Sequence, residues 1–299
     1  MFKRVLIPLD GSSRAELILG QLKPLLERDR SDLLLLRGVY DPPSLVKIDT
    51  GKLLRADAAE AEAYLGQVVH RLERDGLRAR AIVKKESAEE AILQATREQN
   101  IDLIAMTTHG YSGAERWILG SVTEKVLRAA EVPLLVIHSF KRTPSGASVP
   151  LAGESVSFKS ILVPIDAGDQ SLAVLPWVER LAKTYQSEIV LVHVRPEPED
   201  TRSAADPPKL APPVPLTLKI AEDRLVAAGL RVRSVTVTGD PARRLLEMSG
   251  TGGFDLLAMA THGRSGLRRW VLGSIAEKIL RASPIPMLVV PAKAFQPLN

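Results

Sequence analysis

Two glycine-serine pairs are the residues whose types and spacing point most directly to chemistry. Gly120-Ser121 and Gly273-Ser274 each open a helical run, and each follows an apolar strand that ends in Thr-His-Gly. A strand that ends in a glycine loop and feeds a helix N-terminus can bind an anion, because free N–H groups and the helix dipole point at the same place. Glycine also lets a phosphate approach the backbone closely. The pattern therefore indicates a phosphate-binding site in each place.

The same residues have a purely structural alternative. Ser121 with Glu124, and Ser274 with Glu277, have the spacing of capping boxes. In a capping box, side chains of the first turn satisfy the orphan N–H groups of the helix without any ligand. Sequence alone leaves the capping interpretation and the phosphate interpretation open.

The stretch that carries these pairs occurs twice. Residues 107–138 and 260–291 match at 18 of 32 positions when His262 is set against His109, an offset of 153 residues. Short repeats of about 20–50 residues are typical of solenoids, whereas this period equals one ordinary domain. The duplication therefore indicates two similar domains in tandem.

The boundaries of these domains follow from a stretch that loses all periodicity. Residues 139–157 show neither a helical nor a strand pattern and are rich in Ser, Gly and Pro. Such composition is typical of a linker. We expect a first domain at residues 1–140, a linker at residues 141–157 and a second domain at residues 158–299.

Apolar runs alternate with helical patterns in each half, and they position the glycine-serine pairs. Strands rich in Val, Ile and Leu that alternate with helices predict an α/β fold with a parallel sheet and helices on both faces. The second half repeats the first, beginning with strands at residues 161–166 and 189–194, but its proline-rich residues 195–215 predict a mobile flap rather than regular structure. In the first half, strands are predicted at residues 5–10, 33–39, 79–83, 101–106 and 134–137, and helices after Ser12 or Ser13, at 53–74, at 88–98 and after Gly120.

Composition excludes several functional classes. The chain of 299 residues contains no cysteine, so disulfides and thiolate chemistry are excluded, and the lone His109 and His262 lack paired ligands for a metal. The net charge of +5 is scattered without a basic patch interleaved with aromatics, so we expect no nucleic-acid partner. No apolar run approaches the ~20 residues that span a bilayer, and no signal peptide is visible. We therefore expect no membrane partner and a cytoplasmic location.

Two aspartates end the opening strand of each half. Asp10 and Asp166 follow the runs Val-Leu-Ile-Pro-Leu and Ile-Leu-Val-Pro-Ile. A carboxylate at the carboxyl edge of a parallel sheet lies where ligands bind in this architecture. Each aspartate is explained equally well as a cap of the helix that follows.

At this point the residues resemble the universal stress protein family, in a tandem form that covers nearly the whole chain. The resemblance rests on the strand that ends in aspartate and on a Gly-x-x-Gly-(nine residues)-Gly-Ser signature before the last helix of each half. It implies two doubly wound domains, each with a five-stranded parallel sheet of order 3-2-1-4-5 flanked by helices. It also implies ATP binding by members with the full signature, whereas a second group lacks the signature and does not bind ATP.

The resemblance assigns site residues position by position. The family places the first signature residue near ribose and phosphate, the aspartate at the adenine-ribose end, and the backbone at the end of the second strand against adenine. That first residue is Thr107 in one half and Ala260 in the other, in place of the family's glycine. The implied cofactor is ATP, with or without magnesium. The residues assigned in this way are Asp10, Val39, Thr107, Gly110, Gly120 and Ser121 in the first half, and Asp166, Val194, Ala260, Gly263, Gly273 and Ser274 in the second.

Motifs of common enzymes are absent from the sequence. There is no Gly-x-x-x-x-Gly-Lys-Ser/Thr loop, no Gly-x-Ser-x-Gly elbow and no dinucleotide fingerprint after the first strand. We therefore expect no enzyme, or at most a slow intrinsic ATPase. The expected function is a stress-response module that binds ATP and acts by ligand-dependent regulation. The alternative is a scaffold that binds no nucleotide and acts through protein contacts.

Two further expectations concern how the halves relate. In the family the fifth strands pair across a two-fold axis, so residues 134–137 should meet residues 287–290 in an intrachain pseudo-dimer, and a homodimer of whole chains is compatible with this. Apolar edge strands of this kind would promote aggregation if left open. The second site should bind nucleotide more tightly, because its loop carries three arginines, Arg264, Arg268 and Arg269.

Overall fold

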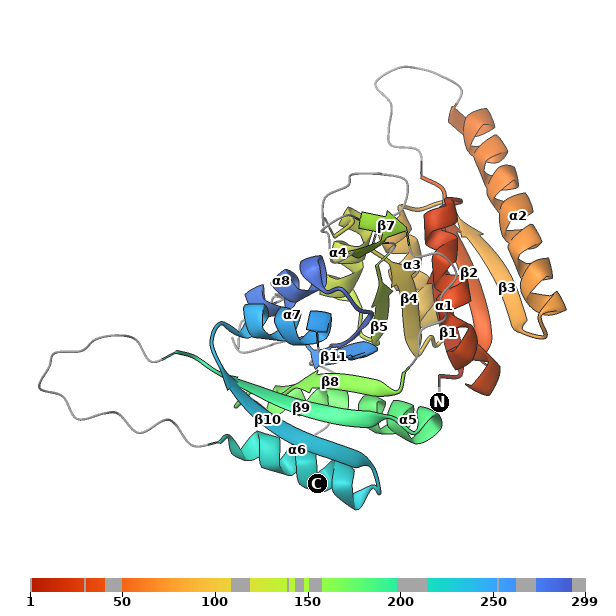
Figure 1. Ribbon diagram of the computed structural model, residues 1–299. Coiled ribbons are helices and arrows are strands. Elements are labelled where there is room, and N and C mark those ends of the chain that lie inside the picture. Colours follow the sequence, from red (N-terminus) through yellow and green to blue (C-terminus); the bar gives the residue numbers. More distant parts are fainter. Residues whose placement is uncertain are drawn as a thin grey trace, which may run out of the picture.

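Ten strands from both halves form one continuous sheet in the computed structural model (Figure 1). The structure describes residues 2–29, 31–40, 50–108, 119–138, 140–142, 148–150, 158–197, 214–251, 253–261 and 273–291. The strand order is β10-β9-β8-β11-β12-β5-β4-β1-β2-β3. Neighbouring strands are parallel except β12 and β5, which are antiparallel. Each half therefore has the order 3-2-1-4-5, and the prediction of two doubly wound α/β units is confirmed.

The elements of the first half lie close to the ranges that the sequence predicts. All five residues of its fourth strand are buried, as expected for a parallel strand covered by helices on both faces. Gly76, with φ of +81°, ends the long second helix, and its N–H bonds to the carbonyl of Glu73 at 2.9 Å. The elements are β1 (Arg4–Pro8), α1 (Ser13–Asp29), β2 (Asp32–Gly38), α2 (Thr50–Arg74), β3 (Arg78–Lys84), α3 (Ala88–Glu98), β4 (Leu103–Thr107), α4 (Ser121–Ala129) and β5 (Leu134–Ile137).

The second half follows the first with one local difference. Its first helical segment starts as a 3-10 turn, η1, and becomes an α-helix with Pro176 in its first turn, where the missing N–H of proline is tolerated. The segment predicted as a flap begins at the end of β9 and ends at the cap of α6, and its residues 198–213 lie outside the described residues. The elements are β8 (Ser160–Pro164), η1 (Asp169–Val174), α5 (Leu175–Tyr185), β9 (Glu188–Arg195), α6 (Leu216–Ala227), β10 (Arg231–Thr238), α7 (Pro241–Thr251), β11 (Leu256–Ala260), α8 (Ser274–Ala282) and β12 (Met287–Val290).

Part of the stretch between the halves forms a small hairpin. β6 (Phe140–Arg142) and β7 (Ser148–Pro150) pair antiparallel, with Phe140 opposite Pro150. The sequence predicts no strand here, because three-residue strands are too short to show a period.

Helices cover both faces of the sheet in two separate layers. One buried core contains side chains from α1, α2, η1, α5 and α6, and the other contains side chains from α3, α4, α7 and α8. Figure 1 shows the same separation in the second half, with α7 and α8 on one side of the strands and α6 on the other. In the described part of the chain, no helix is long and apolar enough to cross a membrane.

The two halves join at the antiparallel pair of β5 and β12. Leu135 lies opposite Leu288 in this pair, and both side chains belong to the core on one face. Val136 lies opposite Met287, and both belong to the core on the other face. The predicted pairing of the two fifth strands is therefore confirmed, and both cores run across the junction.

A second contact between the halves lies near the chain start. The ring of Phe2, just before β1, stacks on the indole of Trp177 in α5, with centroids 5.4 Å apart and planes inclined by 4°. Phe2 is only 1% exposed. Stacked aromatic pairs of this kind add to the free energy that area burial supplies.

Candidate functional site

A cavity of about 450 Å³ lies at the carboxyl ends of β1, β2 and β4 in the first half. In the strand order of this half, β1 and β4 flank the point where the winding of the sheet reverses. Ligands of doubly wound folds bind at this point. Four residues assigned from the sequence line the cavity, namely Asp10, Thr107, Gly120 and Ser121, together with Arg37, Gly38, Thr108, Val122 and Thr123.

The N-terminus of α4 opens onto this cavity without a side-chain cap. Gly120 is the N-cap residue, and it has no side chain that could bond to the first-turn N–H groups. Ser121 is the first helical residue and is exposed, and Glu124 turns away to Arg128, with 2.9 Å between Oε1 and Nη2. The capping-box interpretation is therefore wrong for α4. Because its N-cap is a glycine, the N-terminus of α4 is a position that favours an anion.

The equivalent helix of the second half has the same geometry. Gly273 is the N-cap of α8, with φ −59° and ψ 145°, and it has no side chain that could cap the helix. Glu277 bonds to Arg281 at 2.8 Å instead of reaching back to the N-cap. The capping-box interpretation is wrong for Ser274 and Glu277 as well.

Gly120 is required by the backbone of the protein itself. Its N–H donates to the carbonyl of Thr108 at 2.9 Å, which holds the loop against the end of β4. A Cβ on Gly120 would lie 2.7 Å from the same carbonyl oxygen, closer than real Cβ atoms approach. The hydroxyl of Thr123 adds a bond to the carbonyl of Thr107 at 3.3 Å. The glycine is therefore needed for the loop whether or not a phosphate binds.

The two aspartates hold the loops that follow the first strands. Asp10 Oδ1 accepts the backbone N–H of Ser12 at 2.9 Å and its hydroxyl at 2.6 Å. Ser12 in turn accepts the N–H of Ala15 at 3.1 Å and so caps α1. Asp166 Oδ1 accepts the N–H of Gly168 at 2.8 Å. Both carboxylates thus form the same Asx-type turn, and Asp10 still lines the cavity.

Arg37 brings a positive charge to the cavity, and the sequence gives no strong signal for it. Its guanidinium carbon lies 5.8 Å from the ring centre of Tyr64. Gly11, with φ of +89°, leaves room for it, since a Cβ there would lie 3.1 Å from Arg37 Nη1. The Tyr64 hydroxyl donates to Glu16 Oε1 at 3.0 Å. Burial first, and then the charge of Glu16, raise the pKa of Tyr64 well above its ordinary value.

The strand register shows that Val39 and Val194, which the resemblance assigns as a pair, are not equivalent positions in the two halves. Pro8 pairs with Leu36 in the first half, and Pro164 pairs with Val192 in the second. Counting on from these pairs, Val194 is equivalent to Gly38, and Val39 to Arg195. Gly38 lines the cavity, whereas Val39 is 8% exposed and its N–H donates to the carbonyl of Lys84 at 2.8 Å. Matching the proline of the first strands, rather than valine to valine, gives this register from sequence.

The second half brings its assigned residues to the same edge of the sheet. Asp166 follows β8, Val194 lies in β9, Ala260 ends β11, and Gly273 with Ser274 begins α8. Ala260 is 5% exposed and Thr107, its counterpart, is 8% exposed. The other predicted loop residues lie outside the described residues: Gly110, Gly263, His109, His262, Arg264, Arg268 and Arg269. Within the described part of the chain, no group of three or more His, Cys, Asp or Glu could hold a metal ion.

Comparison with known proteins identifies the class and then the family. The fold and the edge cavity define a tandem doubly wound α/β protein, and a solved universal stress protein from Archaeoglobus fulgidus has the same fold, with a TM-score of 0.71, 23% identity and coverage of 97% of this chain and 98% of that chain. The family model of the universal stress protein family matches residues 1–138 and 157–291. The chain therefore belongs to the universal stress protein family, and it contains the family domain twice.

Curated relatives agree with this assignment. Universal stress protein YxiE of Bacillus subtilis is 29% identical over 146 residues, which are 44% of this chain and 99% of the relative. Universal stress protein Rv2005c of Mycobacterium tuberculosis is 28% identical over 195 residues, 63% of this chain and 61% of that protein. The match to YxiE covers about one half of this chain, and the match to Rv2005c covers more than one half of it.

Proposed function

We propose that this universal stress protein binds an adenine nucleotide, ATP above all, and acts by ligand-dependent regulation rather than by turnover. One observation carries the proposal: α4 begins at an N-cap glycine, which has no capping side chain of its own, and this N-terminus opens onto a cavity at the switch point of the sheet. A helix N-terminus in this position suits a phosphate. The resemblance of the signature to that of ATP-binding family members supplies the adenine part.

The residues of the cavity are compatible with such a ligand. A volume of about 450 Å³ lies within the range of ~300–1,000 Å³ typical of small-molecule sites. Ser121, Val122 and Thr123 place the first turn of α4 at the cavity, and Arg37 adds a cation. Thr107 narrows the site where the family has glycine. Asp10 is a carboxylate in the lining, and magnesium in such sites is held by one or two carboxylates and the phosphates of the nucleotide.

Three finer features belong to the same proposal. The chain acts as an intrachain pseudo-dimer, with domains at residues 1–140 and 158–299, and the pairing of β5 with β12 supports this. Each domain provides one nucleotide site, built in the second from Asp166, Val194, Ala260, Gly273 and Ser274. The protein works in the cytoplasm and needs no catalytic group.

Two measurements test the proposal. Native mass spectrometry of freshly purified protein should show an adenine nucleotide bound to the full chain. Calorimetry should show saturable ATP binding, with weaker binding of adenosine because it lacks the phosphates. Nucleotide binding would be rejected if no nucleotide co-purifies and no heat of binding appears at several hundred micromolar ATP, a concentration that corresponds to a binding free energy of roughly −5 kcal/mol or weaker. Multiple-turnover hydrolysis at rates typical of enzymes, about 10 per second, would reject the regulatory interpretation.

A further inference from the structure

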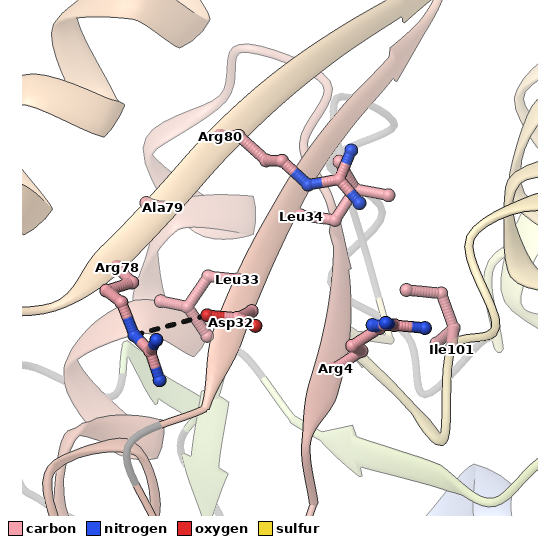
Figure 2. A pocket seen from close by; sticks show the side chains of 8 residues that line it. All are labelled: Arg4, Asp32, Leu33, Leu34, Arg78, Ala79, Arg80 and Ile101. Atoms are coloured by element: carbon pink, nitrogen blue, oxygen red, sulfur yellow. Dashed lines mark ion pairs between the residues drawn. The ribbon is translucent and has the colours of Figure 1, made fainter.

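A second cavity, of about 260 Å³, lies at the opposite edge of the first-half sheet. Arg4, Asp32 and Arg78 are the first residues of β1, β2 and β3, so the cavity lies at the amino ends of these parallel strands. Buried Leu34 and Ile101 form an apolar part of its wall. Figure 2 shows the charged side chains around it, with a dashed line that joins Arg78 to Asp32. This cavity is separate from the site at the carboxyl edge.

Two arginines of this cavity converge on one residue. Arg4 Nη1 donates to the carbonyl oxygen of Gln99 at 3.3 Å, and Arg80 Nη2 donates to Gln99 Oε1 at 2.9 Å. Gln99 is the C-cap of α3, so both guanidiniums are held at the end of this helix. A guanidinium has five N–H donors. Each of these bonds uses one donor of its guanidinium.

The charges at this cavity are not balanced. Arg78 pairs with Asp32, with 3.2 Å between Nε and Oδ1. Within the part of the chain that the structure describes, Arg4 and Arg80 form no ion pair. Asp102 is the other carboxylate close by, and it accepts the backbone N–H groups of Lys3 and Arg4 at 2.7 and 3.2 Å. Three guanidiniums therefore surround the cavity with one paired carboxylate, and the excess is positive.

The second half lacks this arrangement at the equivalent place. Asp255 accepts the N–H groups of Lys159 and Ser160 as Asp102 does in the first half, so Ser160 is the counterpart of Arg4. Arg233 is the counterpart of Arg80 by strand register, and its Nε pairs with Glu188 at 3.1 Å. One arginine is thus absent, Arg233 is paired, and Arg231, the counterpart of Arg78, donates to the carbonyl of Gln186. Among the described residues, the cluster of three guanidiniums is specific to the first half.

We propose that Arg4, Arg80 and Arg78 bind a small molecule through a dianionic phosphate group at this cavity. Guanidinium groups bind phosphate oxygens in a bidentate manner, and two that have no carboxylate partner gain most from such an anion. The small volume suits a single phosphate group with a short attached group better than a whole nucleotide. The apolar wall at Leu34 and Ile101 contacts the attached group. The site is independent of nucleotide binding at the carboxyl edge.

The test compares charge-removing variants in the two halves of the full chain. Calorimetric titrations use inorganic phosphate and glycerol 3-phosphate, at an ionic strength matched with chloride because contacts between exposed charges are screened by salt. Arg4→Gln and Arg80→Gln should each weaken phosphate binding at least about tenfold. Arg233→Gln, the matched control in the second half, should leave it unchanged. Arg80→Lys should retain part of the affinity, because it keeps the charge but loses the bidentate geometry.

The outcomes separate the sources of the phosphate group. Equal binding of both probes supports recognition of the phosphate group alone, and tighter binding of glycerol 3-phosphate supports a phosphorylated metabolite. Thermal unfolding in chloride shows whether each variant is folded. If Arg4→Gln does not fold, Arg80→Lys still tests the proposal. Absence of saturable binding in the unchanged protein overturns the proposal. An equal loss in Arg233→Gln overturns it too.

Discussion

Arg281 of α8 reaches across to Glu124 of α4, with 3.4 Å between Nη2 and Oε2. The reverse contact joins Arg128 of α4 to Glu277 of α8 at 3.7 Å. Each arginine also pairs with the glutamate four residues earlier in its own helix, at 2.9 and 2.8 Å. Four side chains, each about one third exposed, thus form a two-fold network between the halves. Glu124 and Glu277, which the sequence suggests as parts of capping boxes, serve here in an interdomain contact.

We expect a double-mutant cycle on Glu124 and Arg281 to reveal this contact. Glu124→Gln and Arg281→Gln should be coupled by ~0.2–1 kcal/mol in the free energy of unfolding, since the pair is partly exposed. Denaturant unfolding of the two single variants and the double variant measures the coupling. High salt should reduce it, because screening weakens partly exposed pairs.

A distant pair provides the control for this cycle. Glu124→Gln combined with Lys219→Gln, in α6, should be additive within about 0.3–0.5 kcal/mol, because Lys219 pairs with Asp223 on its own helix. Additivity of Glu124→Gln with Arg281→Gln at low salt would show that α4 and α8 do not face each other in solution.

Gly120→Ala should destabilise the protein without any ligand. The new Cβ would lie 2.7 Å from the carbonyl oxygen of Thr108, so the loop must shift at a cost of about 1–3 kcal/mol. Gly66→Ala, in an exposed position of α2 with no atom within 4 Å of the new Cβ, should instead stabilise by roughly 0.5–1 kcal/mol. Denaturant unfolding in the absence of nucleotide measures both. Equal stability of Gly120→Ala and the unchanged protein would contradict the close approach seen here.

The sequence predicts the architecture well because its signals are local and repeated. Unbroken apolar runs mark the strands, and α3 begins and ends where its pattern does, at Ala88 and Glu98. The antiparallel junction also follows from sequence, but only through the resemblance to the family, since periodicity cannot tell which edges pair. The hairpin of β6 and β7 has too few residues for a pattern.

The site is predicted less completely, because its details depend on contacts distant in sequence. The capping box at Ser121 fails because Gly120 takes the N-cap position and Glu124 pairs with Arg128 and with Arg281, 157 positions later. Arg37, which lines the cavity, contacts the ring of Tyr64 although nothing in their spacing relates them. The register of Val39 and Gly38 is fixed by strand pairing, and residue type alone is misleading there. Such contacts become visible only when the chain is folded.

Tyr64 should make the stability of the protein sensitive to alkaline pH. Burial and Glu16 raise its pKa, so above the ordinary tyrosine value of ~10 the unfolded chain loses this proton while the folded protein keeps it. The folded state then binds more protons, and the free energy of unfolding falls as pH rises from about 10 towards the folded pKa. Below that window the group contributes no pH dependence. Tyr64→Phe should therefore show a shallower alkaline decline.

Unfolding at a series of alkaline pH values measures this effect. Tyr64→Phe also loses the hydrogen bond to Glu16, at a cost of about 0.5–1.5 kcal/mol at neutral pH. Tyr40→Phe, at a residue that is 54% exposed, is the matched control and should keep the full alkaline decline. Parallel declines in all three proteins would show that Tyr64 is not responsible.

A negative charge at the start of α4 should separate nucleotide binding from folding. Ser121 is exposed at the first helical position and lines the cavity, so Ser121→Asp places a carboxylate where the phosphates are proposed to bind. The same charge favours the helix by about 0.3–1 kcal/mol through its dipole. We therefore expect the free energy of unfolding to be unchanged or raised, while ATP affinity falls at least tenfold. Ser121→Asn, of similar size and without the charge, should retain the affinity.

The equivalent variant in the second half decides whether the two sites are unequal. If the arginine-rich loop after β11 makes the second site tighter, Ser274→Asp should remove the stronger phase of an ATP titration and Ser121→Asp the weaker one. Both serines follow an N-cap glycine of nearly the same geometry, so the substitutions are matched. Calorimetry resolves the two phases, and adenosine should respond less to either variant since it has no phosphate. Equal effects of both variants would contradict unequal sites, and unaltered ATP binding in the double variant would place the nucleotide elsewhere.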